Sequence, residues 1–260
     1  MYATRWCRSS ERARLEATQK RIDTLTDVAV LAEIEIFHSR PVAPTRRVAL
    51  GHRELPVEPA PGFGGVLLAG IVARFSADLD ADLYDELLLL MRQVERGQRI
   101  PQPRLRHRFQ RDLVGLTKRR QRLIGEHESL RFEFDESGPA APMVLGAVYA
   151  AGQLPASARS DVMELIRRAM RWQGPMGSAF VASILGRGAG SWVVSSLADP
   201  VAWARVTLGL ANEDVAARDL VQRQFRLLLR EAHPDSGGDE DVAARRISEL
   251  SEARRILLLG

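Results

Sequence analysis

The chain has 260 residues, of which 45% are apolar and 27% are charged, so it can bury a core and is not disordered throughout. It carries 37 basic and 33 acidic residues, and the resulting net charge of +4 is too small to indicate nucleic-acid binding by itself. The single cysteine, Cys7, excludes an internal disulfide framework and a zinc site built on several cysteines. The charged N-terminus lacks the apolar stretch of a secretory signal, so we expect a reducing, cytoplasmic setting.

Residues 1–24 form a charged leader without apolar periodicity, which we expect to be a frayed helix or a disordered tail. Residues 25–138 are predicted to form an α+β module of unknown role. Near its start Ile34 and Ile36 alternate with glutamates, which is typical of a half-buried strand, and residues 46–50 can form its partner strand.

The module also contains a predicted helix over residues 78–96. Its leucines recur every three or four residues, aspartates lie near its start, and Gly97 follows its end. The unbroken run of leucines from 87 to 90 predicts burial on two sides. Residues 130–135 alternate again and predict a further strand.

Residues 139–198 are predicted to be a helical middle segment, with Ser157 as one N-cap. Residues 175–198 are low in charge and long enough to span a membrane. Arg187 near the middle and several glycines instead favour a short buried helix, a glycine-rich turn and a second apolar segment. We therefore do not expect a membrane partner.

A basic segment covers residues 104–122, with His107 and Phe109 among its cations. Such a cluster is the electrostatic footprint of nucleic-acid binding, but no RRM, KH or zinc-finger motif accompanies it. We favour a solvated or salt-bridged surface, and nucleic acid or another acidic partner stays open as the alternative.

Catalytic motifs are absent from the sequence. The glycine-rich segments at 62–65 and 186–190 lack the Gly-Lys-Ser/Thr of a phosphate-binding loop, and there is neither a paired-carboxylate motif nor a His-Glu-x-x-His motif. We assign no catalytic residue, no cofactor and no metal ligand, and do not expect an enzyme.

The last sixty residues carry the most information. Asn212 is predicted to cap a helix that ends near Ala232, because Pro234 disfavours the α conformation at the residue before it. A basic stripe of Arg223, Arg226 and Arg230 lies beside the apolar face of this helix. That apolar face consists of Val221, Phe225, Leu228, Leu229 and Ala232.

A second helix is predicted from Asp239 onward. The two helices are separated by His233-Pro234-Asp235 and a polar loop, so we expect them to pack as an antiparallel hairpin. The apolar stripe of the second helix consists of Ala243, Ile247, Leu250, Ala253 and Leu257.

These features resemble the J domain of DnaJ-type co-chaperones. The block FRLLLREAHPDSGG is similar to helix II and the loop of that family, ISELSEARRIL to helix III, and Leu208-Gly209-Leu210 to the end of helix I. The resemblance covers residues 199–260 only. It implies a C-terminal all-α J domain with a short first helix, and hence an α+β chain made of a mixed module, a helical middle and this domain.

The resemblance also implies a function. A J domain docks a DnaK-type chaperone through its His-Pro-Asp loop and stimulates its ATP hydrolysis. His233, Pro234 and Asp235, together with Arg223, Arg226 and Arg230, would be the partner-binding residues.

The sequence departs from the family's pattern in places. Leu227 and Glu231 replace the usual cations and leave less positive charge on this side, and Val201-Ala202-Trp203 replaces the Tyr-rich start of helix I. Residues 1–198 would be the adaptor for an unknown client or target. The alternative is a nucleic-acid- or protein-binding adaptor in which the J domain is a minor or regulatory appendage.

Overall fold

The structure is a computed structural model, which describes residues 28–40, 42, 46–58, 60–126, 129–185, 200–211, 217–232 and 240–259. The expected leader, residues 1–24, lies outside this part of the chain.

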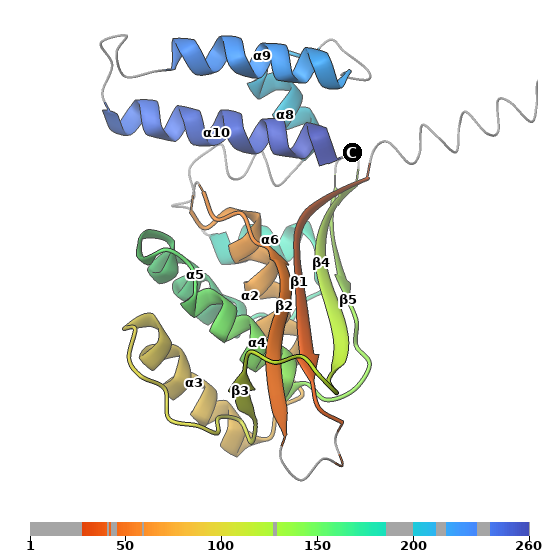
Figure 1. Ribbon diagram of the computed structural model, residues 1–260, viewed down its shortest axis with the longest axis vertical. Coiled ribbons are helices and arrows are strands. Elements are labelled where there is room, and N and C mark those ends of the chain that lie inside the picture. The colour runs from red at the N-terminus through yellow and green to blue at the C-terminus, as the bar shows by residue number, and fades with distance from the viewer. Residues whose placement is uncertain are drawn as a thin grey trace, which may run out of the picture.

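Within the described residues a five-stranded sheet of order β3-β2-β1-β4-β5 forms the centre of the fold (Figure 1). The central strand β1 (Val28–His38) is antiparallel to β2 (Arg47–Glu54) and to β4 (Thr117–Glu126). The edge strand β5 (Ser129–Phe134) is antiparallel to β4, whereas β3 (Arg108–Gln110) is parallel to β2 at the opposite edge. The chain therefore crosses the sheet between β3 and β4.

The two faces of the sheet differ because residues alternate along each strand. Ile34 and Ile36 of β1 are completely buried, whereas the intervening Glu35 is only partly buried. Lys118 and Arg120 of β4 form ion pairs with Glu35 on that outer face, each at 3.1 Å. The strands predicted from alternation near residues 28–37, 46–50 and 130–135 are thus confirmed.

Helices cover the other face of the sheet (Figure 1). Gly146 allows the close approach of one of them, because a Cβ atom at this position would lie 2.8 Å from the side chain of Ile36. The helices are α2 (Gly62–Ser76), α3 (Ala81–Glu95), α4 (Ala141–Gly152), α5 (Ala156–Ala169) and α6 (Ser178–Leu185).

One hydrophobic core joins the expected α+β module to the helical segment that follows it. Leu67 and Leu68 of α2 belong to the same cluster as Val148 of α4 and Ile166 of α5, and all four are fully buried. Together with the helices at the C-terminal end, this gives the mixed α+β fold that the sequence predicts.

Two local predictions were wrong. Leu89 of α3 is 42% exposed, because this helix packs on one side only, so the leucine run is not buried on two sides. Ser157 is not the N-cap of α5 but lies inside the helix. Pro155 precedes the first turn, which begins at Ala156, and proline suits a helix start because its missing N–H is not needed there.

Residues 175–198, the stretch long enough to span a membrane, lie partly outside the described residues. Its described part contains α6, which has eight residues. No helix in the described ranges has both the length and the apolar character needed to cross a membrane.

Two histidines are buried at strand ends. His38, the last residue of β1, and His107, which directly precedes β3, are 4% and 3% exposed. Nδ1 of His38 contacts the Ser39 carbonyl oxygen at 2.9 Å, and Nδ1 of His107 contacts the Leu105 carbonyl oxygen at 2.6 Å. Because a carbonyl can only accept, both imidazoles donate from Nδ1.

Burial lowers the pKa of both histidines below the ordinary 6.5, despite the opposing effect of these hydrogen bonds. At His38 the positive charge of Arg119 lowers the pKa further, and Asp135 works against it. At His107 the charges of Arg46 and His38 have the same lowering effect.

We expect the protein to lose stability as the pH falls below about 6.5, before the carboxylates titrate. A depressed histidine pKa means that the unfolded chain binds more protons in this range, so acid favours unfolding. Urea midpoints measured from pH 8 to pH 5 test this. His38→Gln/His107→Gln should flatten the profile, whereas the same change at the exposed His52 should leave it unchanged. An equally steep profile in the double variant would contradict the assignment.

Candidate partner-binding face

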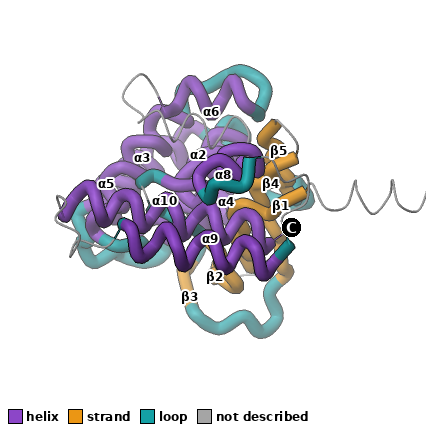
Figure 2. Tube along the Cα trace, turned by 90° about the horizontal axis from the view of Figure 1, so that it is seen from above, coloured by secondary structure: helices purple, strands orange, loops and turns teal. Residues whose placement is uncertain are grey.

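Three helices pack together at the end of the sheet where β1 begins (Figures 1 and 2). They are α8 (Pro200–Thr207), α9 (Arg218–Glu231) and α10 (Glu240–Leu259). In both views α9 and α10 lie side by side, and the chain order makes them antiparallel. The guanidinium of Arg254 on α10 lies 4.8 Å from the ring centre of Phe225 on α9, and Arg246 reaches the Thr207 carbonyl of α8 at 3.4 Å.

The second helix begins where the sequence predicts it, at Glu240. Leu250 and Ala253 of its predicted apolar stripe are completely buried and Ala243 is 8% exposed. Ile247 and Leu257 are partly buried. The predicted stripe is therefore the face with which α10 packs.

The first helix begins later than predicted. Its N-cap is Ala217, which has an extended backbone, and Asp219 supplies the acid of the first turn. Asn212, the predicted cap, lies outside the described residues. Val221 is completely buried, whereas Phe225 and Leu228 are partly buried against the core, so the apolar face points as predicted.

The basic stripe of α9 faces solvent. Arg223, Arg226 and Arg230 are all exposed. The Nε atoms of Arg226 and Arg230 donate to the carbonyls one turn earlier, each at 3.3 Å. These bonds direct two side chains along the helix toward its N-terminus and leave their terminal nitrogens available to a partner.

The His-Pro-Asp tripeptide, residues 233–235, lies outside the described residues. The helix before it ends as predicted, since Ala232 is the C-cap and its N–H donates to the Leu228 carbonyl at 3.0 Å. Leu227 and Glu231, which replace cations of the family's pattern on this helix, are exposed on the solvent side of α9.

A charged cluster ties the helical end to the sheet. Arg255 of α10 donates to the Leu31 carbonyl of β1 at 2.6 Å and to Glu54 of β2 at 3.2 Å. It also holds both carboxylate oxygens of Glu252, at 2.8 and 2.9 Å. Glu252 is only 6% exposed, so this pair is shielded from water. No pattern in the sequence indicates this cluster, because its residues come from distant segments.

Arg255→Ala should destabilise the protein by about 2 kcal/mol, because it leaves a buried carboxylate and a carbonyl without their donor. Urea denaturation measures the loss, and hydrogen exchange should show weaker protection of the amides of α10. Arg223→Ala removes an exposed arginine from the neighbouring helix and should change neither quantity. Equal stability of both variants would contradict a role of this cluster in docking α10.

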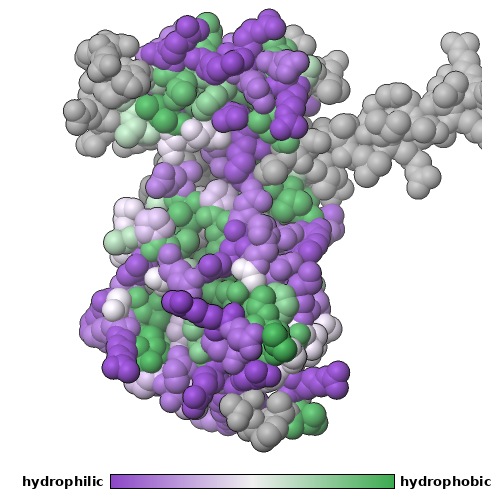
Figure 3. All heavy atoms as spheres, in the orientation of Figure 1, coloured by the Kyte–Doolittle hydropathy of each residue, from purple (hydrophilic) through white to green (hydrophobic). Residues whose placement is uncertain are grey.

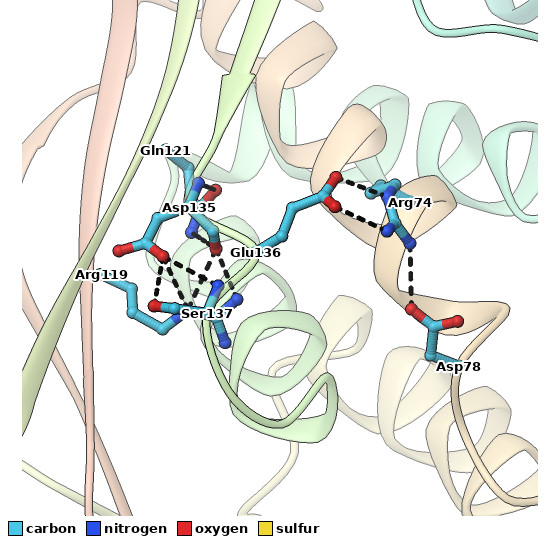
Figure 4. A network of polar contacts seen from close by, with 7 residues as sticks. All are labelled: Arg74, Asp78, Arg119, Gln121, Asp135, Glu136 and Ser137. Atoms are coloured by element: carbon cyan, nitrogen blue, oxygen red, sulfur yellow. Dashed lines mark hydrogen bonds and ion pairs between the residues drawn. The ribbon is translucent and has the colours of Figure 1, made fainter.

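A second polar network lies at the turn after β5 (Figure 4). The side chain of Arg119 is completely buried and donates to the carbonyls of Asp135 and Pro139. Beside it, Arg74 of α2 binds both oxygens of Glu136, at 2.8 and 2.9 Å.

This network holds its carboxylates in the ionised form. Partial burial acts to raise the pKa of Asp135, but the hydrogen bonds from Ser137 and the charge of Arg119 lower it overall. The bidentate Arg74 lowers the pKa of Glu136. A general acid or base needs a pKa near the working pH. The carboxylates of Asp135 and Glu136 are therefore better suited to stabilising the turn than to transferring protons.

The basic segment 104–122 is largely paired. Arg106 binds Asp82 at 2.8 Å and Arg122 binds Glu33 at 2.9 Å. His107 is buried, and Phe109 stacks on Tyr149 with ring centres 4.2 Å apart. These contacts turn the aromatic groups of the segment toward the core.

No group of three or more potential metal-ligating side chains occurs within the described residues. No model of a known protein family matches the chain, and no curated protein or solved structure matches it.

Proposed function

We propose that residues 199–260 form a J domain and that the protein is a co-chaperone, which docks a DnaK-type chaperone and stimulates its ATP hydrolysis. The observation that carries this proposal is the exposed stripe of Arg223, Arg226 and Arg230 on α9, a helix that ends directly before His233. The opposite face of α9 packs on α10, so the basic face is the one left to a partner.

The chemistry of these residues suits such docking. An exposed basic face attracts an acidic surface, which mainly raises the association rate and fixes the orientation. Asp235 can accept charge-assisted hydrogen bonds from an arginine of the partner. Pro234 has a fixed φ angle and no N–H, so it stiffens the loop. Stimulation follows when this docking favours the hydrolysis-competent state of the chaperone.

The α+β part would then supply the adaptor. Arg255 fixes α10 against β1 and β2. Because α9 packs on α10, the arginine stripe of α9 would be held at a defined place on the adaptor. A client or target bound to the α+β part would thereby be delivered to the chaperone.

The experiment is steady-state ATP hydrolysis by a purified DnaK-type chaperone, measured with increasing amounts of this protein. A several-fold, saturable rise in the rate is expected. An unchanged rate at high concentration of the full chain, tested with chaperones from more than one source, would refute the proposal.

A further inference from the structure

At the end of the sheet that lies opposite α9 and α10, the last residue of β1 lies between the strands β2 and β4 (Figure 1). His38, at the end of β1, pairs with Val48 of β2 on one side and with Thr117 of β4 on the other. The loop that leaves β1 and the loop that enters β4 therefore emerge at the same level. Gly115 of the second loop also lies against the guanidinium of Arg47, since a Cβ atom there would be 3.7 Å from its Nη2. We call this end the tip.

The tip exposes aliphatic side chains. Val42 is 89% exposed, Val114 is 76% exposed and Leu113 is 37% exposed. The second loop is a tight turn, in which the Val114 N–H donates to the Asp112 carboxylate at 3.0 Å and the Leu116 N–H donates to the Leu113 carbonyl at 3.2 Å. The turn therefore holds its two apolar side chains at the surface.

Arginines surround these side chains. Arg47 and Arg108 are neighbours in the β2–β3 register, and Arg46 lies close enough to His107 to influence its pKa. Among the described residues, no carboxylate lies within ion-pair distance of any of the arginines of the tip, and Asp112 is the single acid in its two loops. The arginines of the tip are Arg40, Arg46, Arg47, Arg108 and Arg111.

We propose that the tip binds the surface of an anionic lipid membrane, a partner that the sequence did not lead us to expect. Guanidinium groups hydrogen-bond to phosphate, and their attraction to an anionic leaflet adds up over neighbouring arginines. Aliphatic side chains beside them can enter the headgroup region, which lets one surface use both forces. Figure 3 shows hydrophobic and hydrophilic residues together at this lower end.

The same surface suits nucleic acid less well. Single strands are held by bases that stack on aromatic side chains. Near this end, Phe109 is already stacked on Tyr149, and Phe37 is only partly exposed, with its ring against Gly51. The exposed apolar groups of the tip are aliphatic. A membrane contact at the tip would leave α9 at the far end of the molecule, free to meet a partner (Figure 1).

The test is co-sedimentation of the full chain with vesicles of phosphatidylcholine alone and of phosphatidylcholine mixed with phosphatidylglycerol. We expect binding to the anionic vesicles only, with an affinity that falls as salt is added. Arg46→Glu/Arg47→Glu should weaken binding at least tenfold, since each arginine near such a surface contributes about fivefold. Val114→Asp should weaken binding several-fold without a change in the arginines.

The matched control is Arg92→Glu/Arg96→Glu, which reverses two exposed charges on and beside α3, away from the tip. It should bind vesicles like the parent chain. Equal binding to neutral and anionic vesicles, or equal losses in control and tip variants, would overturn the proposal. Binding to a nucleic-acid homopolymer with no binding to either kind of vesicle would also overturn it. None of these readouts needs the chaperone, so this proposal and the co-chaperone proposal can fail separately.

Discussion

His233→Gln is expected to remove the stimulation of chaperone ATP hydrolysis while the protein stays folded. The tripeptide follows the C-cap of α9 directly, and the helix itself ends with its own backbone hydrogen bond from Ala232. This backbone hydrogen bond does not depend on the side chain at position 233. The measurement is the maximal rate of ATP hydrolysis at saturating concentration of the variant, with circular dichroism to verify the fold.

Reversal of the basic stripe should give a different result. Arg223→Glu/Arg226→Glu/Arg230→Glu changes three exposed charges, so it should raise the concentration needed for half-maximal stimulation by about tenfold or more at low salt. The maximal rate should fall much less than with His233→Gln. The two variants should differ in this way because the arginine stripe attracts the chaperone, whereas the tripeptide is proposed to act once the two proteins are docked.

A matched control keeps this experiment specific. Arg92→Glu/Arg96→Glu reverses charges on the α+β part and should stimulate like the parent chain. If His233→Gln stimulates as strongly as the parent chain, the proposed role of the tripeptide is wrong. If all charge-reversed variants lose stimulation equally, net charge and not the stripe is responsible.

Much of the architecture follows from periodicity in the sequence. The alternation around Ile34 and Ile36 predicts β1, and the spacing of Leu250 and Ala253 predicts the buried face of α10, since both patterns record which side meets the core. The strand β3 could not be predicted, because it has three residues and its place beside β2 depends on contacts across the sheet. The start of α9 also differs from prediction, since Ala217 has no side-chain capping group.

The sequence predicts those parts of the candidate site whose residues lie within a single helix. The stripe on α9 and the apolar face of α10 each lie within one helix, so helical spacing is enough to find them. The Arg255 cluster and the tip join segments that are far apart in the chain, and nothing in the sequence brings these segments together. The inward arginine could not be predicted, because residues 117–122 are all polar and no alternation marks their buried side; the structure places Arg119 and Gln121 on the face of Leu123.

Arg119→Ala is the substitution expected to cost the most stability. The guanidinium lies 5.3 Å from the ring centre of Phe75 and donates to the Asp135 carbonyl at 3.1 Å and to the Pro139 carbonyl at 2.8 Å. Its removal leaves the Pro139 carbonyl without this donor and leaves the Asp135 carbonyl with the longer bond from Gln121, at 3.4 Å, and it opens a cavity under the turn after β5. Together these effects should lower the free energy of unfolding by about 3–5 kcal/mol.

Two further substitutions separate the contributions. Arg119→Met fills most of the volume without donors, so it should lose less than Arg119→Ala, about 2 kcal/mol, through the lost hydrogen bonds to the Pro139 and Asp135 carbonyls alone. Arg120→Met removes the neighbouring arginine on the outer face, whose ion pairs are partly exposed, and should lose less than about 1 kcal/mol. Urea denaturation with an unchanged slope measures all three. Equal midpoints for the Arg119 and Arg120 variants would show that the inward guanidinium does not hold the turn, because Arg119, unlike Arg120, donates to the carbonyls of Asp135 and Pro139.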